Sequence, residues 1–412
     1  MPSGPGGAEG TFHAGEGRVP NPGMRFQQAA LRAPGEEAEI STARFRAIDP
    51  GVKLAARPHR GDVPACRASS GPRSGPPEHP PPIPPEAIVN PPEVVVNSPE
   101  AVVSPPEAVV SSPEVVVIGN AGIDTQVYLH GADIDFTVEA NFTENLDVLG
   151  QAGAYASRGY AALGRRTSFV GAVGEDPAGQ VVREELARAG VDTRGLFLDP
   201  KGTARSVNLM YRDGRRKNFY DGKGHMDLHP DLDACRASLA GARLAHFNIP
   251  SWARQLLPVA RSLGLTIACD IQDVVDPGDP YRRDFIESAD ILFCSGVNHP
   301  DPAPLVEALL RARPEAIVVV GMGAQGCALA TRAGLRRYPP APLDLPVLDT
   351  NGAGDALAVG FLVSHVLEGR SMEEAALRGQ IAARVACAQR APKRMITAEE
   401  LERYAQALAA PR

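Results

Sequence analysis

The segment from Leu348 to Asp355 reads Leu-Asp-Thr-Asn-Gly-Ala-Gly-Asp and passes directly into an apolar run. A turn of small residues that opens a helix can bind an anion, because the first N–H groups of a helix are unpaired and its dipole favours negative charge. Asp355 would lie beside that anion and could take a proton from an attacking hydroxyl, which is the chemistry of phosphoryl transfer. The alternative is that Asp355 only caps the helix. The residues that leave room for the anion are Gly352, Ala353 and Gly354.

The elements around this turn support the chemical interpretation. A strand-like segment at 345–348 precedes it, and strand, tight turn and helix is the context in which such a motif acts. The second half alternates between strands and helices, which predicts a parallel sheet covered by helices on both faces, with ligands at the carboxyl ends of strands. We expect strands at 244–247, 266–270, 291–294 and 316–320, and helices at 252–263, 304–311, 356–368 and 372–389.

The first half of the folded part is predicted in the same way. A continuous β-branched run at 115–118 is typical of a strand buried on both faces. Alternating segments flank the turn at Gly214, which predicts a β-hairpin. The other expected elements are a helix within 150–163, a strand at 168–174, a helix at 180–188 and the two hairpin strands at 206–211 and 217–220.

Residues 1–112 differ in composition from the rest of the 412-residue chain. They are rich in Pro, Gly, Arg and Ser, so we expect a disordered extension, and one large α/β domain over 113–412. A seven-residue Pro-Glu repeat begins at Pro85, and its fifth copy runs into the first strand. We interpret the four earlier copies as duplications, and the extension as dispensable or as an over-extended translation start.

Bulk properties narrow the class of protein. The net charge is −7 and no dense basic cluster is present, which argues against a nucleic-acid partner. No apolar stretch reaches bilayer length, and the N-terminus lacks a secretory pattern. The six cysteines are widely spaced, with no C-x-x-C pair. We therefore expect a cytoplasmic protein without a membrane partner.

Four motifs, taken in order, resemble the ribokinase-like (PfkB) carbohydrate kinase family over residues 114–412. The turn at 349–355 is similar to the C-terminal signature of that family, and the supporting matches lie at 171–179, 190–193 and 320–326. The resemblance implies an α/β fold: a three-layer α/β/α sandwich with a mostly parallel central sheet and a small β-sheet lid. The lid strands would lie within about 125–225, and a homodimer could form through them.

The resemblance also implies a reaction, which is transfer of the γ-phosphoryl group of ATP to a hydroxyl of a sugar or sugar-like small molecule. Asp355 would be the general base, the backbone of Gly352, Ala353 and Gly354 would neutralise the phosphoryl group, and Mg²⁺ would bridge the phosphates. Two alternatives stay open. One is a nucleoside kinase of the same family, and the other is a catalytically weak relative that binds sugar or nucleotide for regulation.

Further site residues follow from the resemblance, each with a structural alternative. Asp124 matches the carboxylate that grips sugar hydroxyls at the end of the first strand, or it caps a turn or helix. Asp349 and Asn351 fall where some relatives hold a monovalent cation such as K⁺, or they hydrogen-bond the turn itself. The nucleotide loop would contain Gly321, Gly323 and Gly326, whose alternative role is packing.

The chain departs from the family pattern at three positions. In the first signature, Gln151 follows Gly150 where a second glycine is usual, so its amide either reaches the substrate or narrows the pocket. Tyr155 replaces a substrate-binding asparagine and either presents its ring to a ligand or packs inside the helix. Asn298 replaces the glutamate that orders magnesium-bound water at the nucleotide site. Similar first-signature substitutions occur in actinobacterial relatives, which suggests an unusual glycoside or aminocyclitol substrate rather than free ribose.

Overall fold

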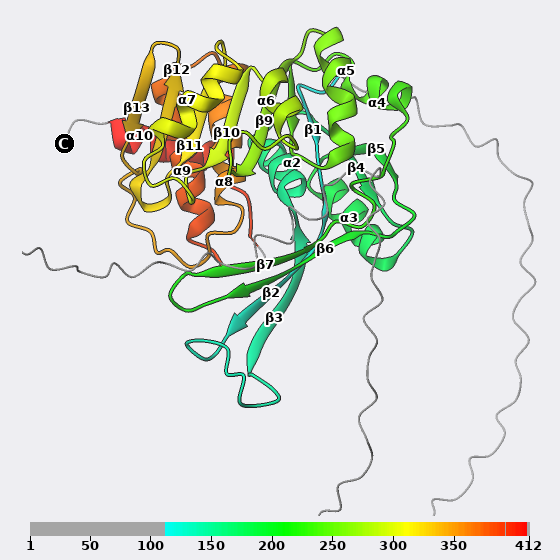
Figure 1. Cartoon of the computed structure of the whole chain (residues 1–412), viewed down its shortest axis with the longest axis vertical. Coiled ribbons are helices and arrows are strands. Elements are labelled where there is room, and N and C mark those ends of the chain that lie inside the picture. The colour runs from blue at the N-terminus through cyan, green and yellow to red at the C-terminus, as the bar shows by residue number, and fades with distance from the viewer. Residues whose placement is uncertain (1–111, 392, 410–412) are drawn as a thin grey trace, which may run out of the picture. The chain divides into compact units, whose positions relative to one another are not determined.

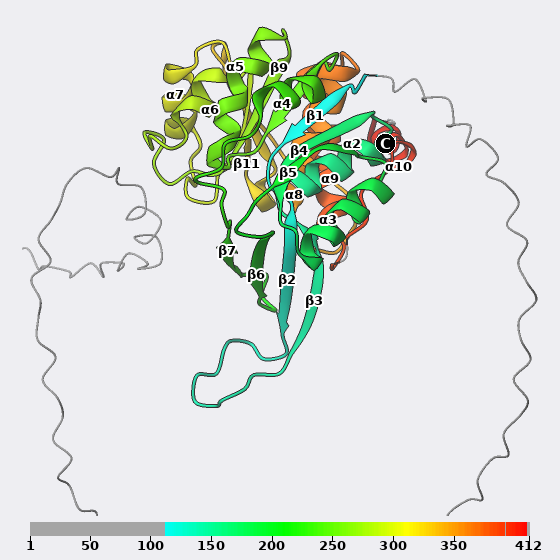
Figure 2. The ribbon, with the colours of Figure 1, turned by 90° about the vertical axis from the view of Figure 1, so that its right-hand side faces the viewer.

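The computed structural model describes residues 112–391 and 393–409. The expected disordered extension and its repeats lie outside these residues, so the proposed division of the chain stays a prediction. Within the described part the chain forms a large α/β body from which a small second sheet projects (Figures 1 and 2). No helix in 112–391 or 393–409 combines the length and apolar character that a membrane crossing requires.

The large sheet is mostly parallel. Seven strands, from β11 to β5 in spatial order, run parallel, and β12 and β13 add an antiparallel edge. Strand β1, which lies between β8 and β4, is completely buried, as its β-branched sequence predicts. The spatial order is β13 (Gly334–Tyr338), β12 (Cys327–Thr331), β11 (Ile317–Gly321), β10 (Ile291–Ser295), β9 (Thr266–Asp273), β8 (Leu244–Phe247), β1 (Val115–Ile118), β4 (Thr167–Val173) and β5 (Asp192–Leu198).

Helices cover both faces of this sheet and form two separate cores. Alternate β1 residues point to opposite faces, so Val115 and Val117 join one core while Val116 and Ile118 join the other. The first core is covered by α2 (Ala152–Ala162), α3 (Pro177–Arg188), α8 (Ala353–Leu362), α9 (Met372–Cys387) and α10 (Ala398–Ala409). The second is covered by α4 (Leu232–Leu239), η2 (Ser251–Leu256), α5 (Leu257–Ser262), α6 (Arg283–Ser288) and α7 (Ala303–Ala312). The predicted α/β sandwich is confirmed.

The lid is a four-stranded sheet that stands away from the large sheet (Figure 2). Its hairpin strands are antiparallel and meet at Gly214, whose φ of 84° suits a glycine, so the predicted hairpin is confirmed. The strand order is β3 (Thr143–Gly150), β2 (Gly122–Leu129), β6 (Ala204–Met210) and β7 (Arg216–Asp221). These strands connect directly to the large body at Gly122 and Gly150, which places the lid over the carboxyl end of β1.

Two predictions about the segments on either side of Gly352 were wrong. Residues 345–348 form no strand; instead the N–H of Leu348 donates to the carbonyl of Cys387 at 2.8 Å. Pro346 and the prolines before it lack the N–H groups that a ladder needs. The helix expected at 356–368 begins earlier, at Ala353, and changes to a π-helical turn, η4 (Val363–Leu367), before it ends.

Helix α8 is held close to α9 by two glycines. A methyl group on Gly360 would lie 2.9 Å from Cα of Gly379, and one on Gly379 would lie 2.6 Å from the carbonyl oxygen of Leu357. Neither contact is possible without moving a helix, so both positions require glycine. The glycine pair therefore fixes the position of α8 relative to α9.

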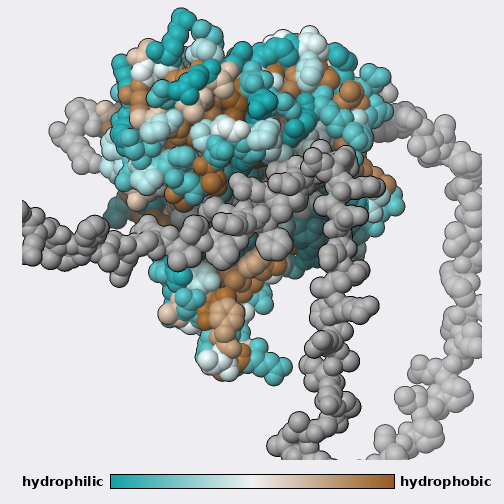
Figure 3. All heavy atoms as spheres, in the orientation of Figure 1, coloured by the Kyte–Doolittle hydropathy of each residue, from teal (hydrophilic) through white to brown (hydrophobic). Residues whose placement is uncertain are grey.

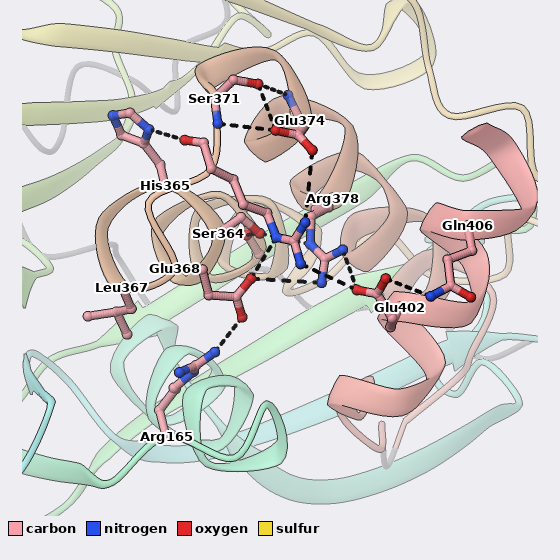
Figure 4. A network of polar contacts seen from close by, with 12 residues as sticks. Arg165, Ser364, His365, Leu367, Glu368, Ser371, Glu374, Arg378, Glu402 and Gln406 are labelled. Atoms are coloured by element: carbon pink, nitrogen blue, oxygen red, sulfur yellow. Dashed lines mark hydrogen bonds and ion pairs between the residues drawn. The ribbon is translucent and has the colours of Figure 1, made fainter.

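A polar network fastens the far end of α8 to α9 and α10 (Figure 4). The guanidinium of Arg378 is almost fully buried, donates to Oγ of Ser364 at 3.1 Å and pairs with Glu402 at 2.8 Å. Glu368 pairs in turn with Arg165, which follows α2. Because a buried cation must be paired, this network ties the C-terminal helix to the body.

Candidate active site

The first turn of α8 is open beside Gly354. Gly352 is the N-cap in a left-handed conformation, with φ of 74°, and Ala353, Gly354 and Asp355 are the first helical residues. Within the described residues, the N–H groups of Gly354 and Asp355 have no backbone partner. A methyl group on Gly354 would meet nothing within 4 Å, so the space above the turn is free. The alternative in which Asp355 caps the helix is wrong, because Gly352 occupies that position.

The carboxyl group of Asp355 lies in an acidic environment. Burial raises its pKa well above the usual value, and the charge of Asp270 raises it further, while Arg216 opposes both effects. Asp270, near the end of β9, is 8% exposed, and burial raises its pKa to about 6. A carboxylate whose pKa is raised toward neutrality is a stronger base than an ordinary aspartate.

Asp124 joins the lid to the catalytic turn. It is the third residue of β2, rather than lying at the end of the first strand as predicted, and it is 4% exposed. Its carboxylate accepts hydrogen bonds from Nε2 of Gln151 at 2.8 Å and from Nδ2 of Asn351 at 3.4 Å. The capping alternative is wrong, because Asp124 lies inside a strand and the N-caps of α2 and α8 are Gln151 and Gly352.

Gln151 adopts a backbone conformation that normally requires glycine. Its φ is 75° and its ψ 153°, at the position where the family pattern has its second glycine. Its Nε2 donates both to Asp124 and to Oγ of Ser206, at 2.7 Å, so the amide nitrogen orders lid side chains. Gly150 must remain glycine, because a methyl group there would lie 2.1 Å from Cγ of Asp124.

Tyr155 packs beneath the catalytic turn. The residue is 7% exposed, and its ring lies 3.2 Å from where a methyl group on Gly352 would be. Its hydroxyl accepts a hydrogen bond from Nδ2 of Asn351 at 3.2 Å, and burial raises its pKa above the usual range. The packing alternative for Tyr155 therefore describes its position better than an open stacking face.

Asp349 and Asn351 face a lysine that the sequence motifs did not reveal. The N–H of Asn351 donates to Oδ1 of Asp349 at 2.7 Å, so the two residues do hydrogen-bond the turn itself. Their main-chain oxygens accept from Nζ of Lys393, and Oδ2 of Asp349 accepts from the hydroxyl of Tyr128 at 3.0 Å. Burial lowers the pKa of Lys393, and the negative charge of Asp349 opposes that effect.

The predicted nucleotide loop connects β11 to β12. Gly326 has φ of 88°, and a methyl group there would lie 2.2 Å from the carbonyl oxygen of Tyr338, so this glycine has a backbone role. Gly323, with φ of 56°, faces open space, and a methyl group on Gly321 would lie 3.5 Å from Cδ2 of Leu357, an ordinary contact. Asn298 donates to the carbonyl of Val274 at 3.3 Å and thus ties down its own loop.

Four residues of the site were missed by sequence reasoning. Asn248 follows β8, is 1% exposed, and has no partner for either amide atom within the described residues. Asp270 and Asn248 are both polar residues at carboxyl ends of expected strands, which is a signal that could have identified them. Arg216, whose Nη1 donates to Oδ1 of Asn351, and Lys393 come from a lid strand and a C-terminal loop, and no motif marked them.

Comparison with known proteins decides the family. The model of the pfkB family of carbohydrate kinases matches residues 112–251 and 284–398. The chain belongs to this family. The predicted ribokinase-like fold and the predicted carbohydrate kinase are both confirmed.

Three relatives illustrate the range of this pfkB kinase's neighbours. The acarbose 7(IV)-phosphotransferase of Actinoplanes sp. is 31% identical over 275 residues, which cover 66% of this chain and 91% of that one. The solved structure of a microbiome-derived acarbose kinase has 28% sequence identity to this chain and a TM-score of 0.67. The match covers 72% of this chain and 100% of the acarbose kinase chain. The ATP-dependent ribose-1-phosphate kinase of Halopiger xanaduensis is 28% identical over 60% of this chain and 83% of its own.

Proposed function

We propose that this kinase transfers the γ-phosphoryl group of ATP to a hydroxyl of a glycoside or aminocyclitol held between the lid and the N-terminus of α8. The observation that carries the proposal is the open turn at Gly354 beside the raised-pKa carboxyl of Asp355. A binding protein needs no such base, which disfavours the regulatory alternative. ATP as the donor is supported by the name of the Halopiger relative.

The chain's own groups account for the steps around the reacting hydroxyl. Asp355 takes the hydroxyl proton as the oxygen attacks, and its raised pKa suits that transfer. The backbone N–H of Gly354, which has no backbone acceptor among the described residues, is available to the charge that develops on the phosphoryl oxygens at this helix N-terminus. The positive charge of Arg216, which already acts on Asp355, adds to this stabilisation.

Binding of Mg²⁺ remains a prediction, and the site can provide some of the ligands that the ion needs. Residues 112–391 and 393–409 contain no group of three or more His, Cys, Asp or Glu side chains that could hold a metal ion. Mg²⁺ does not need one, because it commonly binds through one or two carboxylates, substrate phosphates and water. Asp270 is the carboxylate beside the turn that fits this role, and bound Mg²⁺ would supply neutralisation of phosphate charge.

A sugar-like acceptor fits the lid better than a nucleoside does. The lid underside offers hydrogen-bonding groups, namely the carboxylate of Asp124 and the hydroxyl of Ser206, ordered by Gln151. The ring of Tyr155, the aromatic residue that could have stacked on a base, instead packs against Gly352 of the turn. The acarbose-modifying activity in the names of two relatives supports a glycoside acceptor.

Turnover of ATP against a panel of glycosides, aminocyclitols, free sugars and nucleosides tests the proposal. On the best acceptor, Asp355→Asn should lower kcat by about 10²–10⁴-fold, because it removes the base. Ligand-induced thermal stabilisation should persist in this variant, since the lid contacts are intact. An unchanged kcat in Asp355→Asn would disprove the base assignment, and turnover restricted to nucleosides would favour the alternative acceptor.

The predicted homodimer and cytoplasmic location are not tested by the structure. The lid does carry exposed apolar side chains, and Figure 3 shows hydrophobic atoms gathered along it. Val207 and Phe219 are neighbours across the β6–β7 pair and are 39% and 55% exposed. A small apolar face of this kind supports the proposal that two lids pair, which sedimentation of the protein in solution would examine.

A further inference from the structure

The side chain of Lys393 ends inside the catalytic turn. Its Nζ lies 2.7 Å from the main-chain oxygen of Asp349, 2.5 Å from the main-chain oxygen of Asn351 and 3.3 Å from Oδ1 of Asp349. The side chains of Lys393 and Asp349 are 2% and 0% exposed, so water does not screen this pair. The three oxygen atoms therefore surround a single buried positive group.

An ammonium group matches this arrangement. A protonated lysine has three N–H donors and no acceptor, and here three oxygens lie around one nitrogen. Two of those oxygens are carbonyls, and the third belongs to a carboxylate, which is a set that also suits a small monovalent cation. The ammonium is a compact point charge, comparable in size with K⁺, so the two can occupy the same cradle but not together.

The backbone around Lys393 is anchored from several elements, so the position of Nζ is set by the fold. Arg158 of α2 donates to the carbonyl of Lys393 at 3.0 Å. Gln389, just after α9, forms hydrogen bonds with both the N–H and the carbonyl of Arg394. The N–H of Ala391 donates to the hydroxyl of Tyr128, the lid residue that also donates to Asp349.

We propose that Lys393 is a built-in cation for the catalytic turn, and that this kinase needs no monovalent metal ion at Asp349 and Asn351. The cation site that the family resemblance implied is thus filled by the chain's own side chain. Lys393 is a positioning residue: it holds Asn351, whose side chain contacts Asp124, and Asn351 leads directly into Gly352 and the catalytic helix. The inference about the cradle rests on the geometry of the turn and not on the identity of the acceptor.

The test replaces one monovalent salt by another at constant ionic strength. Wild-type turnover and wild-type Tm should be the same in KCl, NaCl and choline chloride. Lys393→Ala should lose about 10–100-fold in kcat in choline chloride, because the turn is misplaced, and regain activity when K⁺ or NH₄⁺ is added. Its Tm should also rise with K⁺ or NH₄⁺, since a cation that binds only the folded state stabilises it.

Two further variants separate a vacated cradle from general damage. Lys393→Met keeps an unbranched side chain in the cradle, so K⁺ should not restore the kcat of this variant. Lys201→Ala removes an exposed lysine that pairs with Asp227 and should behave as wild type. Stimulation of the wild-type enzyme by K⁺ over choline would overturn the proposal, and so would full activity of Lys393→Ala in choline chloride.

The Tm measurements need no substrate, so they remain informative even if the proposed acceptor is wrong. If Lys393→Ala does not fold in choline chloride, folding of that variant on addition of K⁺ or NH₄⁺ supports the proposal. Failure to fold in any of the salts, together with K⁺-dependent stabilisation of the wild type, contradicts it.

Discussion

The amide nitrogen of Gln151 lies 2.8 Å from Oδ1 of Asp124, although the backbone of Gln151 occupies a region that almost always belongs to glycine. Such a conformation costs about 1–3 kcal/mol for a residue with a side chain. The hydrogen bonds to Asp124 and Ser206 offset part of this cost. Gln151 therefore keeps a strained backbone conformation, and in that conformation its amide orders the carboxylate of Asp124 at the base of the lid.

Substitution of Gln151 should separate these two effects. Gln151→Gly relieves the backbone, whereas Gln151→Ala keeps the strained φ, and both remove the amide. We expect Gly to be more stable than Ala by about 1–2 kcal/mol in urea unfolding, because only Ala retains the strain. Both should raise the KM for the acceptor. Equal stability of the two variants would show that the observed φ carries no strain.

Gly354→Ala should lower activity without harming the fold. A methyl group there meets no atom of the protein, and alanine favours a helix over glycine by about 1 kcal/mol. The methyl would instead occupy the space where the phosphoryl group must approach the N–H groups. We expect an unchanged or raised Tm together with a large loss of kcat. Full activity of Gly354→Ala would place the phosphoryl group elsewhere.

The rate should rise with pH as Asp355 loses its proton. The negative charge of Asp270 raises the pKa of Asp355, so Asp270→Asn should lower that pKa and shift the acid limb of the kcat profile to lower pH. Because Asp270 is also the proposed Mg²⁺ ligand, kcat is measured at saturating Mg²⁺, and the position of the limb is compared rather than its height. The two groups titrate together, so the profile reports apparent values for the pair. A shift of the acid limb to higher pH in Asp270→Asn would contradict this account.

The same substitution should stabilise the folded protein at neutral pH. The pKa of Asp270 is raised from 3.8 to about 6 in the folded state, so the destabilisation is absent below pH 3.8, grows as pH rises between the two values and is complete above about 6. Asp270→Asn should gain on the order of 2 kcal/mol at pH 7.5 and much less at pH 4.5. Urea unfolding at the two pH values measures the difference. A gain that does not depend on pH would refute the charge explanation.

A chain that begins at Ser112 should fold and retain the activity of the full-length protein. The family match begins at residue 112, and the main-chain contacts of β1 begin at Glu114, whose carbonyl accepts from Arg243. Equal kcat and KM for the two chains would support the proposal that the first 111 residues are dispensable. Insolubility or loss of turnover in the shorter chain, beside an active full-length protein, would contradict it.

Sequence reasoning predicted the fold well because its signals were local and repeated. The buried run at β1, the glycine turn at Gly214 and the regular strand–helix alternation each reflect a pattern within a few residues. The prediction failed at 345–348, where an apolar run looked like a strand although Pro346 prevents a continuous ladder. It also placed the start of α8 three residues late, because small residues hid the first helical turn.

Sequence motifs predicted only those site residues that lie within the motifs themselves. Asp355 and Asp124 both belong to sequence motifs, and the structure brings them close enough for the charge of Asp124 to raise the pKa of Asp355. Arg216 and Lys393 belong to no motif, because their positions depend on how a lid strand and a C-terminal loop fold back toward the turn. The contacts of Lys393 and Arg216 with the turn join residues 42 to 135 positions apart in the sequence, and such contacts carry no local periodicity, so a single sequence does not reveal them.

The glycine pair between α8 and α9 has a consequence for how this enzyme can diverge. Any side chain at Gly360 or Gly379 would force α8 and α9 apart. The direction of α8 therefore cannot change through single substitutions at these two positions. The lid has no such restriction, since Val207 and Phe219 are loosely surrounded. We therefore expect substitutions in the lid to be tolerated more readily than substitutions at the glycine pair.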